Sequence, residues 1–536
     1  MARISLVDVD PYIKRKTYES LGLGTLAAIL RQRGDQVQLF KAYVSAEQPA
    51  SLESAERRIR EFQPRLVGST AYNTNIKLID VLYTALKQSL PDVVTLVGGI
   101  FATLNAQAIL EDNPAIDGVV LGEAEDTILE IAERMTRDRP TDLSGICGIW
   151  WRSAGTRPEL PALRSNLDDI PAPARDITHE HASAGQVFTS LATARGCYGA
   201  CSFCSVNTFS QVQRGLRWRG RSPRLVVDEM ESLVRNHQIQ AIFIEDSSLE
   251  DPPALGKQRI RELCEEILRR RLHLFLRFEA RAEGFQKEDA DLLDLMRRAG
   301  FCYVIVGMES GSEKVLRVYN KRAHSSDNTQ CYHLFTSHGI FVYPSIIMFQ
   351  PYATFDDLRE SAALLFSLNK TYRFDLLTSR LSVYSNTPIY RRLQRDGLIA
   401  PEFTYRSELN YHYVNPDVQR VGAQLTAQWK KTDDFVMREI DYLLCTGRIF
   451  AESLGLQRQF QDLEETSEEV KRLLSANHYT FFLRSLDLAE RQWDAECFNR
   501  WLDDLAAQNR PHLERMLAAY QSVRKAAVDH GVSLPF

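Results

Sequence analysis

The first 145 residues alternate short apolar runs with amphipathic stretches. The apolar runs, at 4–9, 37–40, 66–70, 93–97 and 118–121, are rich in Val, Ile and Leu and predict strands. Between them, as at 23–33 and 76–90, apolar positions recur at helical spacing. Five β–α units of this kind predict an α/β domain with a doubly wound, flavodoxin-like parallel sheet over residues 1–145.

Small and polar residues stand where these predicted strands end. Ligands of doubly wound sheets bind at the carboxyl ends of the strands, where the strand order reverses. Small residues at such an edge let a bulky ligand approach the backbone closely. The alternative is a set of ordinary tight turns between strands and helices. The candidate ligand-binding residues at this edge are Ser69, Thr70, Gly98, Gly99, Gly122 and Glu123.

The pattern changes twice further along the chain. Residues 146–185 read as a hairpin followed by a Pro-rich linker. The β–α rhythm then resumes over 186–395, with strands predicted at 187–193, 241–244, 272–277, 303–307, 341–349 and 376–383. Six units predict a partial (β/α)6 barrel with its chemistry at the carboxyl mouth. Residues 396–536 predict a helical C-terminal domain, with helices at 425–444, 463–474, 483–506 and 513–528.

Composition narrows the class of protein. With 536 residues, 44% hydrophobic and 25% charged, the chain has the make-up of a multidomain globular protein. Its net charge of −5 disfavours a general nucleic-acid binder. Because no window approaches 18 uninterrupted apolar residues and no signal peptide is evident, we expect a cytoplasmic protein without a membrane span. Six of its nine cysteines are scattered singly and read as small buried hydrophobes.

The other three cysteines carry the chemistry. Cys197, Cys201 and Cys204 form a Cys-x3-Cys-x2-Cys loop directly after the first predicted barrel strand. Soft thiolates select iron–sulfur clusters, zinc or Cu(I). A structural zinc site needs four protein ligands, and His179 and His181 are the nearest histidines without suitable spacing. Three thiolates on a four-iron cube instead leave one iron open, where S-adenosylmethionine (SAM) can be chelated and split reductively to a 5′-deoxyadenosyl radical.

The cysteine loop resembles that of the radical SAM superfamily, including the aromatic Phe203 before the last cysteine. Further segments are similar in the same order. They imply SAM contacts from Glu245 and Asp246 at the second strand, Arg281 at the third, and Glu309 and Ser310 in Gly-x-Glu-Ser-Gly-Ser. The chain departs from the family at Ser385-Asn386, where Pro-Gly is common, and at 348–352, where a Gly-x-Pro-Gly turn is common.

The N-terminal part resembles the cobalamin-binding domain of one branch of that superfamily. The similar segments are 21–26, 97–103 with Thr103, 121–125 and the Pro-Ala-Pro-Ala-Arg-Asp linker at 171–176. Cobalamin mutases place a histidine on cobalt through an Asp-x-His-x-x-Gly loop, and this chain has no histidine before His179. Two options follow: cobalamin held without a lower protein histidine, or a domain that kept the fold and lost the cofactor.

The resemblance implies a cobalamin-dependent methyltransferase acting on an unactivated carbon of a small molecule in specialised metabolism. One SAM would methylate the cobalamin and another would supply the radical. An external donor of flavodoxin or ferredoxin type would provide electrons. Two alternatives stay open. The first is a non-methylating radical SAM enzyme, such as a diol dehydratase, a cyclase or a rearranging enzyme. The second is a non-catalytic cobalamin or metal sensor.

Overall fold

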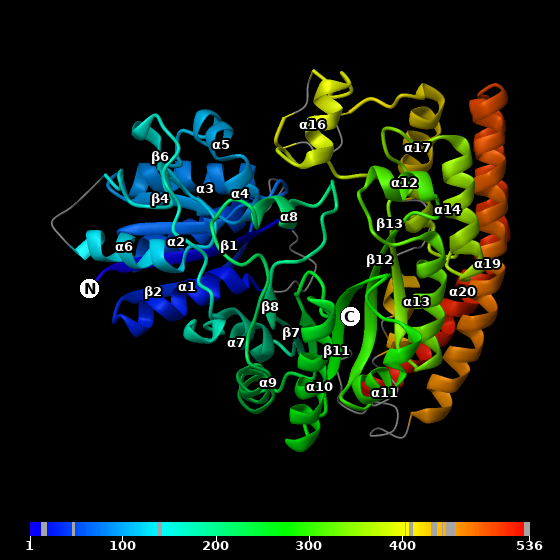
Figure 1. Ribbon diagram of the computed structural model, residues 1–536, viewed down its shortest axis with the longest axis horizontal. Helices are drawn as coiled ribbons and strands as arrows, with labels where there is room; N and C mark the ends of the chain where they lie inside the picture. The colour runs from blue at the N-terminus through cyan, green and yellow to red at the C-terminus, as the bar shows by residue number, and fades with distance from the viewer. Residues whose placement is uncertain are drawn as a thin grey trace.

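The chain is laid out in three parts that follow one another from left to right in Figure 1. The computed structural model describes all residues except 12–18, 45–48, 137–141, 402–403, 407–410, 430–436, 442, 446–455 and 530–536. An α/β domain, drawn in blue and cyan, precedes a second α/β part in green, and long helices in orange and red cover its far side. The predicted fold class is therefore confirmed. The boundaries at 145, 185 and 395 stay a prediction.

The N-terminal sheet has the strand order β2-β1-β3-β4-β5-β6. Its strands are β1 (Arg3–Asp10), β2 (Gln36–Tyr43), β3 (Leu66–Thr70), β4 (Val94–Gly98), β5 (Gly118–Val120) and β6 (Ile149–Trp151). The first five run parallel, as predicted, and β6 pairs antiparallel with β5. Residues 149–151 thus form an edge strand of this sheet rather than a separate hairpin. The strand order reverses between β1 and β3, which places the expected ligand edge there.

Both faces of this sheet are covered, which explains why β1 is apolar at nearly every position. Ile4 and Leu6 face a core formed with α1 (Leu21–Gln32) and α6 (Glu125–Thr136). Val7 and Val9 face the opposite core, formed with α2 (Pro49–Phe62), α3 (Ile76–Ser89) and α5 (Ala106–Asp112). The Pro-rich linker lies on α1, where Ala174 donates a 3.0 Å hydrogen bond to the carbonyl of Gly24.

The second sheet has the order β13-β12-β11-β10-β7 and is parallel throughout. Its strands are β7 (Phe188–Leu191), β10 (Ala241–Ile244), β11 (Phe275–Arg281), β12 (Phe301–Glu309) and β13 (Phe341–Ile346). Helices on its outer face include α9 (Pro223–His237), α10 (Pro253–Arg269), α11 (Ala290–Arg298), α13 (Ser325–Ser337) and α14 (Phe355–Ser367). Along β11 and β12, buried residues alternate with half-buried ones that face the concave side.

The sixth strand predicted at 376–383 was wrong in its extent. Its first half belongs to the short helix α15 (Phe374–Thr378), and only an isolated bridge between Phe349 and Arg380 continues the sheet. Phe349 exchanges two 2.9 Å backbone hydrogen bonds with Ser379 and Leu381. The apolar run gave the impression of a strand because Leu376 and Leu377 are both buried, in a helical turn.

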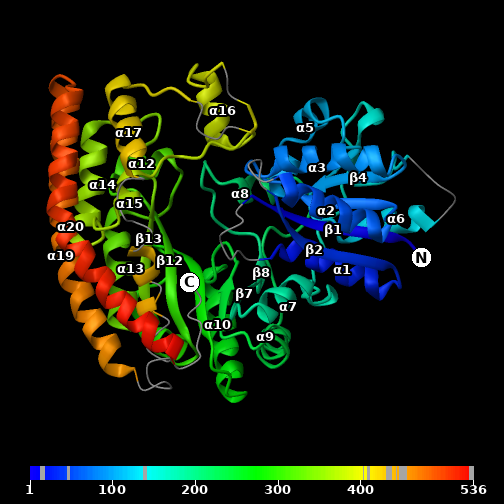
Figure 2. The same ribbon diagram turned by 180° about the vertical axis from the view of Figure 1, so that it is seen from behind.

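The C-terminal part is helical, as predicted, but its helices are longer than expected. Figure 2 shows α19 (Gln457–Arg491) and α20 (Ala495–Asp529) lying side by side along the barrel. The breaks predicted after 474 and 506 do not occur, and the helix predicted at 483–506 is instead interrupted at 492–494. The polar His478 lies inside α19, where it is buried and hydrogen-bonded at both ring nitrogens. Its imidazole lies 2.9 Å from the carbonyl of Thr371 and 2.9 Å from the amide of Asn509. The segment predicted at 425–444 begins on α17 (Pro416–Trp429) and is helical again at 437–441 and 443–444, while 430–436 and 442 lie outside the described residues.

None of the helices in the described part of the chain is both long and apolar enough to cross a bilayer.

Candidate functional site

The three cysteines lie on a loop at the carboxyl end of β7, the first strand of the barrel sheet. The loop starts after β8 (Ala194–Arg195), leads into α8 (Ser205–Phe209) and returns to β9 (Arg219–Gly220), which pairs with β8. Gly196 makes this path possible. Its φ is +88°, and a Cβ there would lie 1.6 Å from the carbonyl oxygen of Arg217.

The three cysteines are part-buried, and Gly199 lies beside two of their sulfurs. The backbone N–H of Gly199 lies 3.2 Å from Cys197 Sγ, and a Cβ on Gly199 would lie 3.2 Å from that sulfur and 3.9 Å from Cys201 Sγ. Burial raises the pKa of all three thiols, that of Cys201 to about 11. For Cys204, the backbone N–H groups of Asn207 and Val206 oppose this rise in pKa. A metal bound here would favour the thiolate form, because the thiolate is the metal ligand.

This donor set fits an iron–sulfur cube better than a single ion. All three cysteines are free of disulfides. Among the described residues, no three His, Cys, Asp or Glu side chains are grouped as ligands of one metal ion. His181 instead lies 3.0 Å from the Tyr43 hydroxyl, and His179 stacks edge-on against His237.

Two carboxylates that the sequence analysis did not identify, Asp251 and Glu250, hold the cysteine loop directly or through Arg281. Asp251 accepts a 2.9 Å hydrogen bond from the N–H of Tyr198 and forms a 2.7 Å ion pair with Arg281. Glu250 accepts a 3.1 Å hydrogen bond from the N–H of Arg281. Both carboxylates are fully buried. Arg281, predicted as a cofactor contact, therefore joins β11 to the cysteine loop.

Glu309 lies at the end of β12 in a strained conformation, with φ at +64°. Its carboxylate pairs with Lys321 at 3.4 Å, and Lys321 also opposes the rise in pKa of Cys201. A Cβ on Gly307 would lie 2.7 Å from the Glu309 carboxylate, so that glycine provides its space. Ser310, also predicted as a SAM contact, has its hydroxyl 3.0 Å from that of Ser361 on α14. The sequence analysis missed Lys321 because its partners Glu309 and Cys201 belong to other elements of the chain.

The acidic pair at the end of β10 divides into two roles. Asp246 is buried and accepts hydrogen bonds from the N–H groups of Thr193 at 2.7 Å and Ala194 at 2.9 Å, so it shapes the approach to the cysteine loop. Glu245 lines a cavity and its side chain is exposed to it. Desolvation by the cavity walls raises the pKa of Glu245 to about 7. Phe203 lies edge-on against Tyr319, 5.1 Å between ring centres.

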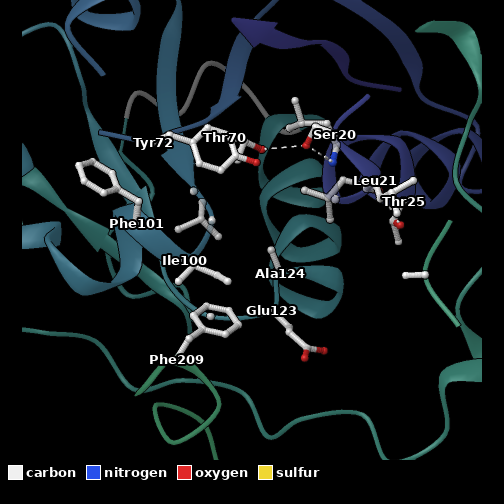
Figure 3. Close-up of a pocket in the computed structure, with 18 of the residues that line it drawn as sticks. Ser20, Leu21, Thr25, Thr70, Tyr72, Ile100, Phe101, Glu123, Ala124 and Phe209 are labelled. Carbon is white, nitrogen blue, oxygen red and sulfur yellow. Dashed lines mark hydrogen bonds between the residues drawn. The ribbon is translucent and has the colours of Figure 1, made fainter. Parts of the chain in front are cut away.

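One cavity of about 920 Å³ joins the two α/β parts. It extends from the carboxyl ends of the N-terminal strands to the barrel mouth, where Glu245, Ser247 and Tyr384 line it next to Gly196 and Ser205. Figure 3 shows its middle, with Thr70, Tyr72 and Phe101 on one side and Phe209 of the barrel part near Glu123. This volume lies at the upper end of the usual range for ligand pockets.

A slot continues this cavity into the N-terminal domain. It runs between the sheet, at Leu6, Gly68 and Leu96, and the helices, at Leu23 and Ile128. Gly22 opens onto it, and a Cβ on Gly22 would have no heavy atom within 4 Å. This apolar slot, with Gly22 and Gly68 in its lining, would accommodate part of a bulky ligand such as cobalamin.

Most of the residues predicted at this edge line the cavity, namely Ser69, Thr70, Gly98, Gly99, Gly122 and Glu123. Thr103 does not. Its hydroxyl donates to the carbonyl of Gly99 at 2.9 Å and accepts from the N–H of Gly122 at 3.0 Å, which ties two lining turns together. The hydroxyl of Thr70 lies 3.2 Å from that of Ser20, a lining residue that the sequence analysis missed.

The departure at Ser385-Asn386 also has a structural reason. Asn386 adopts the left-handed conformation with φ at +66°, which asparagine tolerates better than most residues. Its amide donates a 2.7 Å hydrogen bond to the carbonyl of Leu104 in the N-terminal domain. Asparagine thus supplies the turn that glycine makes in the family and adds a contact between the two parts.

Comparison with known families agrees with this architecture. A family model described as the B12 binding domain matches residues 15–132, and one described as the radical SAM superfamily matches residues 191–365. The chain therefore belongs to the branch of the radical SAM superfamily that carries an N-terminal cobalamin-binding domain. A radical SAM domain implies a [4Fe–4S] cluster and SAM, a B12-binding domain implies cobalamin, and the cysteine loop, cavity and slot fit these groups.

Individual relatives are distant. The chain is 25% identical over 375 residues to the anaerobic magnesium-protoporphyrin IX monomethyl ester cyclase of Cereibacter sphaeroides, covering 68% of this chain and 58% of that protein. It is 29% identical over 305 residues to an uncharacterized methyltransferase of Pyrococcus horikoshii, covering 56% and 63%. The matches thus span about three fifths of these relatives. The fold is similar to that of OxsB, a cobalamin-dependent SAM radical enzyme, with a TM-score of 0.71 and 19% identity over 100% of this chain and 82% of OxsB.

Proposed function

We propose that this protein is a cobalamin-dependent radical SAM methyltransferase that acts on an unactivated carbon of a small molecule. The observation that carries the proposal is the single cavity lined jointly by the N-terminal strand ends and the barrel mouth. Gly196 and Ser205, which flank the three cysteines, line this cavity together with the N-terminal strand ends, so a carbon held there would lie between the two cofactor sites. Such positioning supplies much of the rate of a reaction between bound groups. The name of the Pyrococcus relative, a methyltransferase, supports the same reaction class.

When bound, the cluster with SAM supplies a 5′-deoxyadenosyl radical and cobalamin supplies a methyl group. Cys197, Cys201 and Cys204 hold the cluster, and the Arg281–Asp251 pair fixes their loop. Glu309, with Lys321, borders the cysteine loop and orients the charged end of SAM. Glu245, with a pKa near 7, can give or take a proton at its carboxylate oxygens beside the substrate.

The proposal includes the partners of the enzyme and its compartment. The cavity suits a small molecule, and the net charge of −5 disfavours nucleic acid as the substrate. A flavodoxin- or ferredoxin-type protein donates the electrons, and the reaction takes place in the cytoplasm.

Two products of SAM test the methylation. The protein is reconstituted anaerobically with iron, sulfide and hydroxocobalamin, reduced, and supplied with SAM and candidate substrates. Methylation predicts S-adenosylhomocysteine and 5′-deoxyadenosine in equal amounts. Release of 5′-deoxyadenosine without S-adenosylhomocysteine in substrate-dependent turnover would show that the methylation assignment is wrong.

The second candidate is a non-methylating radical enzyme that forms or rearranges a ring or dehydrates a diol. It is favoured by the name of the Cereibacter relative, a cyclase. This candidate predicts the opposite result in the same assay, namely 5′-deoxyadenosine alone.

A further inference from the structure

The segment that carries the three cysteines is closed at its base by a short ribbon. β8 and β9 pair antiparallel, and the cysteine loop and α8 lie between them in sequence. In this register, Arg195 stands directly opposite Arg219. Like charges directly opposite one another weaken an antiparallel pair. This ribbon of two residues per strand therefore needs an anion between its arginines.

The anion comes from the other domain. Glu123, in the turn after β5, lies 2.8 Å from a guanidinium nitrogen of Arg195 and 3.0 Å from one of Arg219. Glu125, at the start of α6, adds a 2.7 Å contact to Arg195. These are the only carboxylates that pair with either arginine among the residues that the structure describes. Arg219 is buried and Glu123 is nearly so, so the contact is shielded from solvent and salt.

Backbone contacts of Gly122 and Glu123 also hold the β5–α6 turn against the segment that returns from the cysteines. The N–H of Glu123 donates a 2.6 Å hydrogen bond to the side-chain oxygen of Gln213, which lies on the segment between α8 and β9. Gly122 has φ at +73°, and a Cβ there would lie 2.3 Å from the same oxygen. The β5–α6 turn thus fits tightly against the segment that returns from the cysteines. Gly122 and Glu123 also line the cavity where cobalamin fits.

We propose that Glu123 is a positioning residue that couples cobalamin binding to the order of the cluster-bearing loop. A cobalamin that fixes the β5–α6 turn also fixes the carboxylate that holds Arg195 and Arg219 together. An ordered cluster loop, in turn, holds the cobalamin site in shape. Such coupling is reciprocal by thermodynamic necessity. The inference rests on both cofactors being bound and is independent of whether the reaction is a methylation.

The test is the affinity for hydroxocobalamin, measured by absorbance titration on the full chain with and without a reconstituted cluster. In the wild type we expect the cluster to tighten cobalamin binding by about fivefold or more, the usual range for coupled sites. Glu123→Gln should bring the two affinities within about twofold of one another. Methyl transfer is not measured, so a failed methylation assay leaves this result intact.

Two further variants make the outcome specific. Asp126→Asn is the matched control, because Asp126 lies on the same first turn of α6 but pairs with Arg164 of the linker rather than with the ribbon. It should keep the wild-type ratio. Glu123→Asp keeps the charge on a shorter side chain and should give an intermediate ratio, which also covers the case in which Glu123→Gln fails to fold. A wild-type ratio of one, or the wild-type ratio retained in both Glu123 variants, would overturn the proposal.

Discussion

The two α/β parts present their strand ends to the same cavity, but they do so with different chemistry. The N-terminal part offers a slot of small and apolar residues, such as Gly22, Gly68 and Leu96. The barrel mouth offers charged groups: Glu245 lines the cavity, and Arg281, Glu309 and Lys321 stand beside the cysteine loop. One site therefore selects its ligand by shape and the other by charge and thiolate chemistry. Substitutions in the two parts should therefore impair ligand binding in different ways.

The largest effect is expected at the cluster. Cys201→Ala removes one of three thiolates and should abolish SAM cleavage, because the other two cysteines of the loop are already ligands and the next in sequence, Cys147 and Cys264, lie outside the loop. Production of 5′-deoxyadenosine by the reduced, reconstituted protein measures this. Cys264→Ala is the control. Its side chain is buried in the barrel core, so it should only lower stability, by about 1 kcal/mol. Cleavage retained in Cys201→Ala would refute the ligand assignment.

A bulky side chain in the slot of the N-terminal part should weaken cobalamin binding without lowering the stability of the protein. Gly22→Leu places a side chain in the open slot and should weaken hydroxocobalamin binding by about tenfold or more. Because leucine is a better helix former than glycine, the chain itself should be no less stable. Ser54→Leu, an exposed substitution on α2 that does not line the cavity, should leave binding unchanged. Unchanged affinity in Gly22→Leu would show that the slot is not used.

The buried carboxyl group of Glu279 in the barrel should make the free energy of unfolding depend on pH. Burial raises the pKa of Glu279 on β11 from 4.5 to about 7. Between these values the unfolded chain has lost the proton while the folded chain keeps it, so the free energy of unfolding should fall as pH rises. Glu279→Gln should flatten this fall by about 1–2 kcal/mol. Denaturant titrations of cofactor-free protein at several pH values measure it. A profile identical to wild type would contradict the shift.

The smallest effect is expected at the contact between the parts. Asn386→Ala loses the hydrogen bond to Leu104 and places alanine at a φ of +66°, which should cost about 1–2 kcal/mol. Asn386→Gly loses the same bond but tolerates the conformation, so it should cost less. Thermal unfolding of both variants separates strain from the lost bond. Equal melting temperatures for the two would contradict a role for strain.

The sequence predicted what is local and missed what is assembled across distance. The cysteine loop was visible because its three thiols lie within eight residues of one another, and β3 and β10 were placed at their observed bounds by continuous apolar runs. Asp251 and Lys321 were missed because the groups they contact come from other elements of the chain. Glu123 was read as a cofactor contact, and no local pattern could show that arginines 72 and 96 residues away would pair with it.

The central claim is that one chain holds a cluster with an open iron and a cobalamin facing the same cavity. Metal analysis combined with absorption spectroscopy of a single, desalted, anaerobically reconstituted sample tests it most directly. The account predicts about four irons and one corrin per chain, with no zinc, and an EPR signal of the reduced cluster that changes when SAM is added. One zinc without iron, or four irons with an EPR signal indifferent to SAM and no retained corrin, would contradict it.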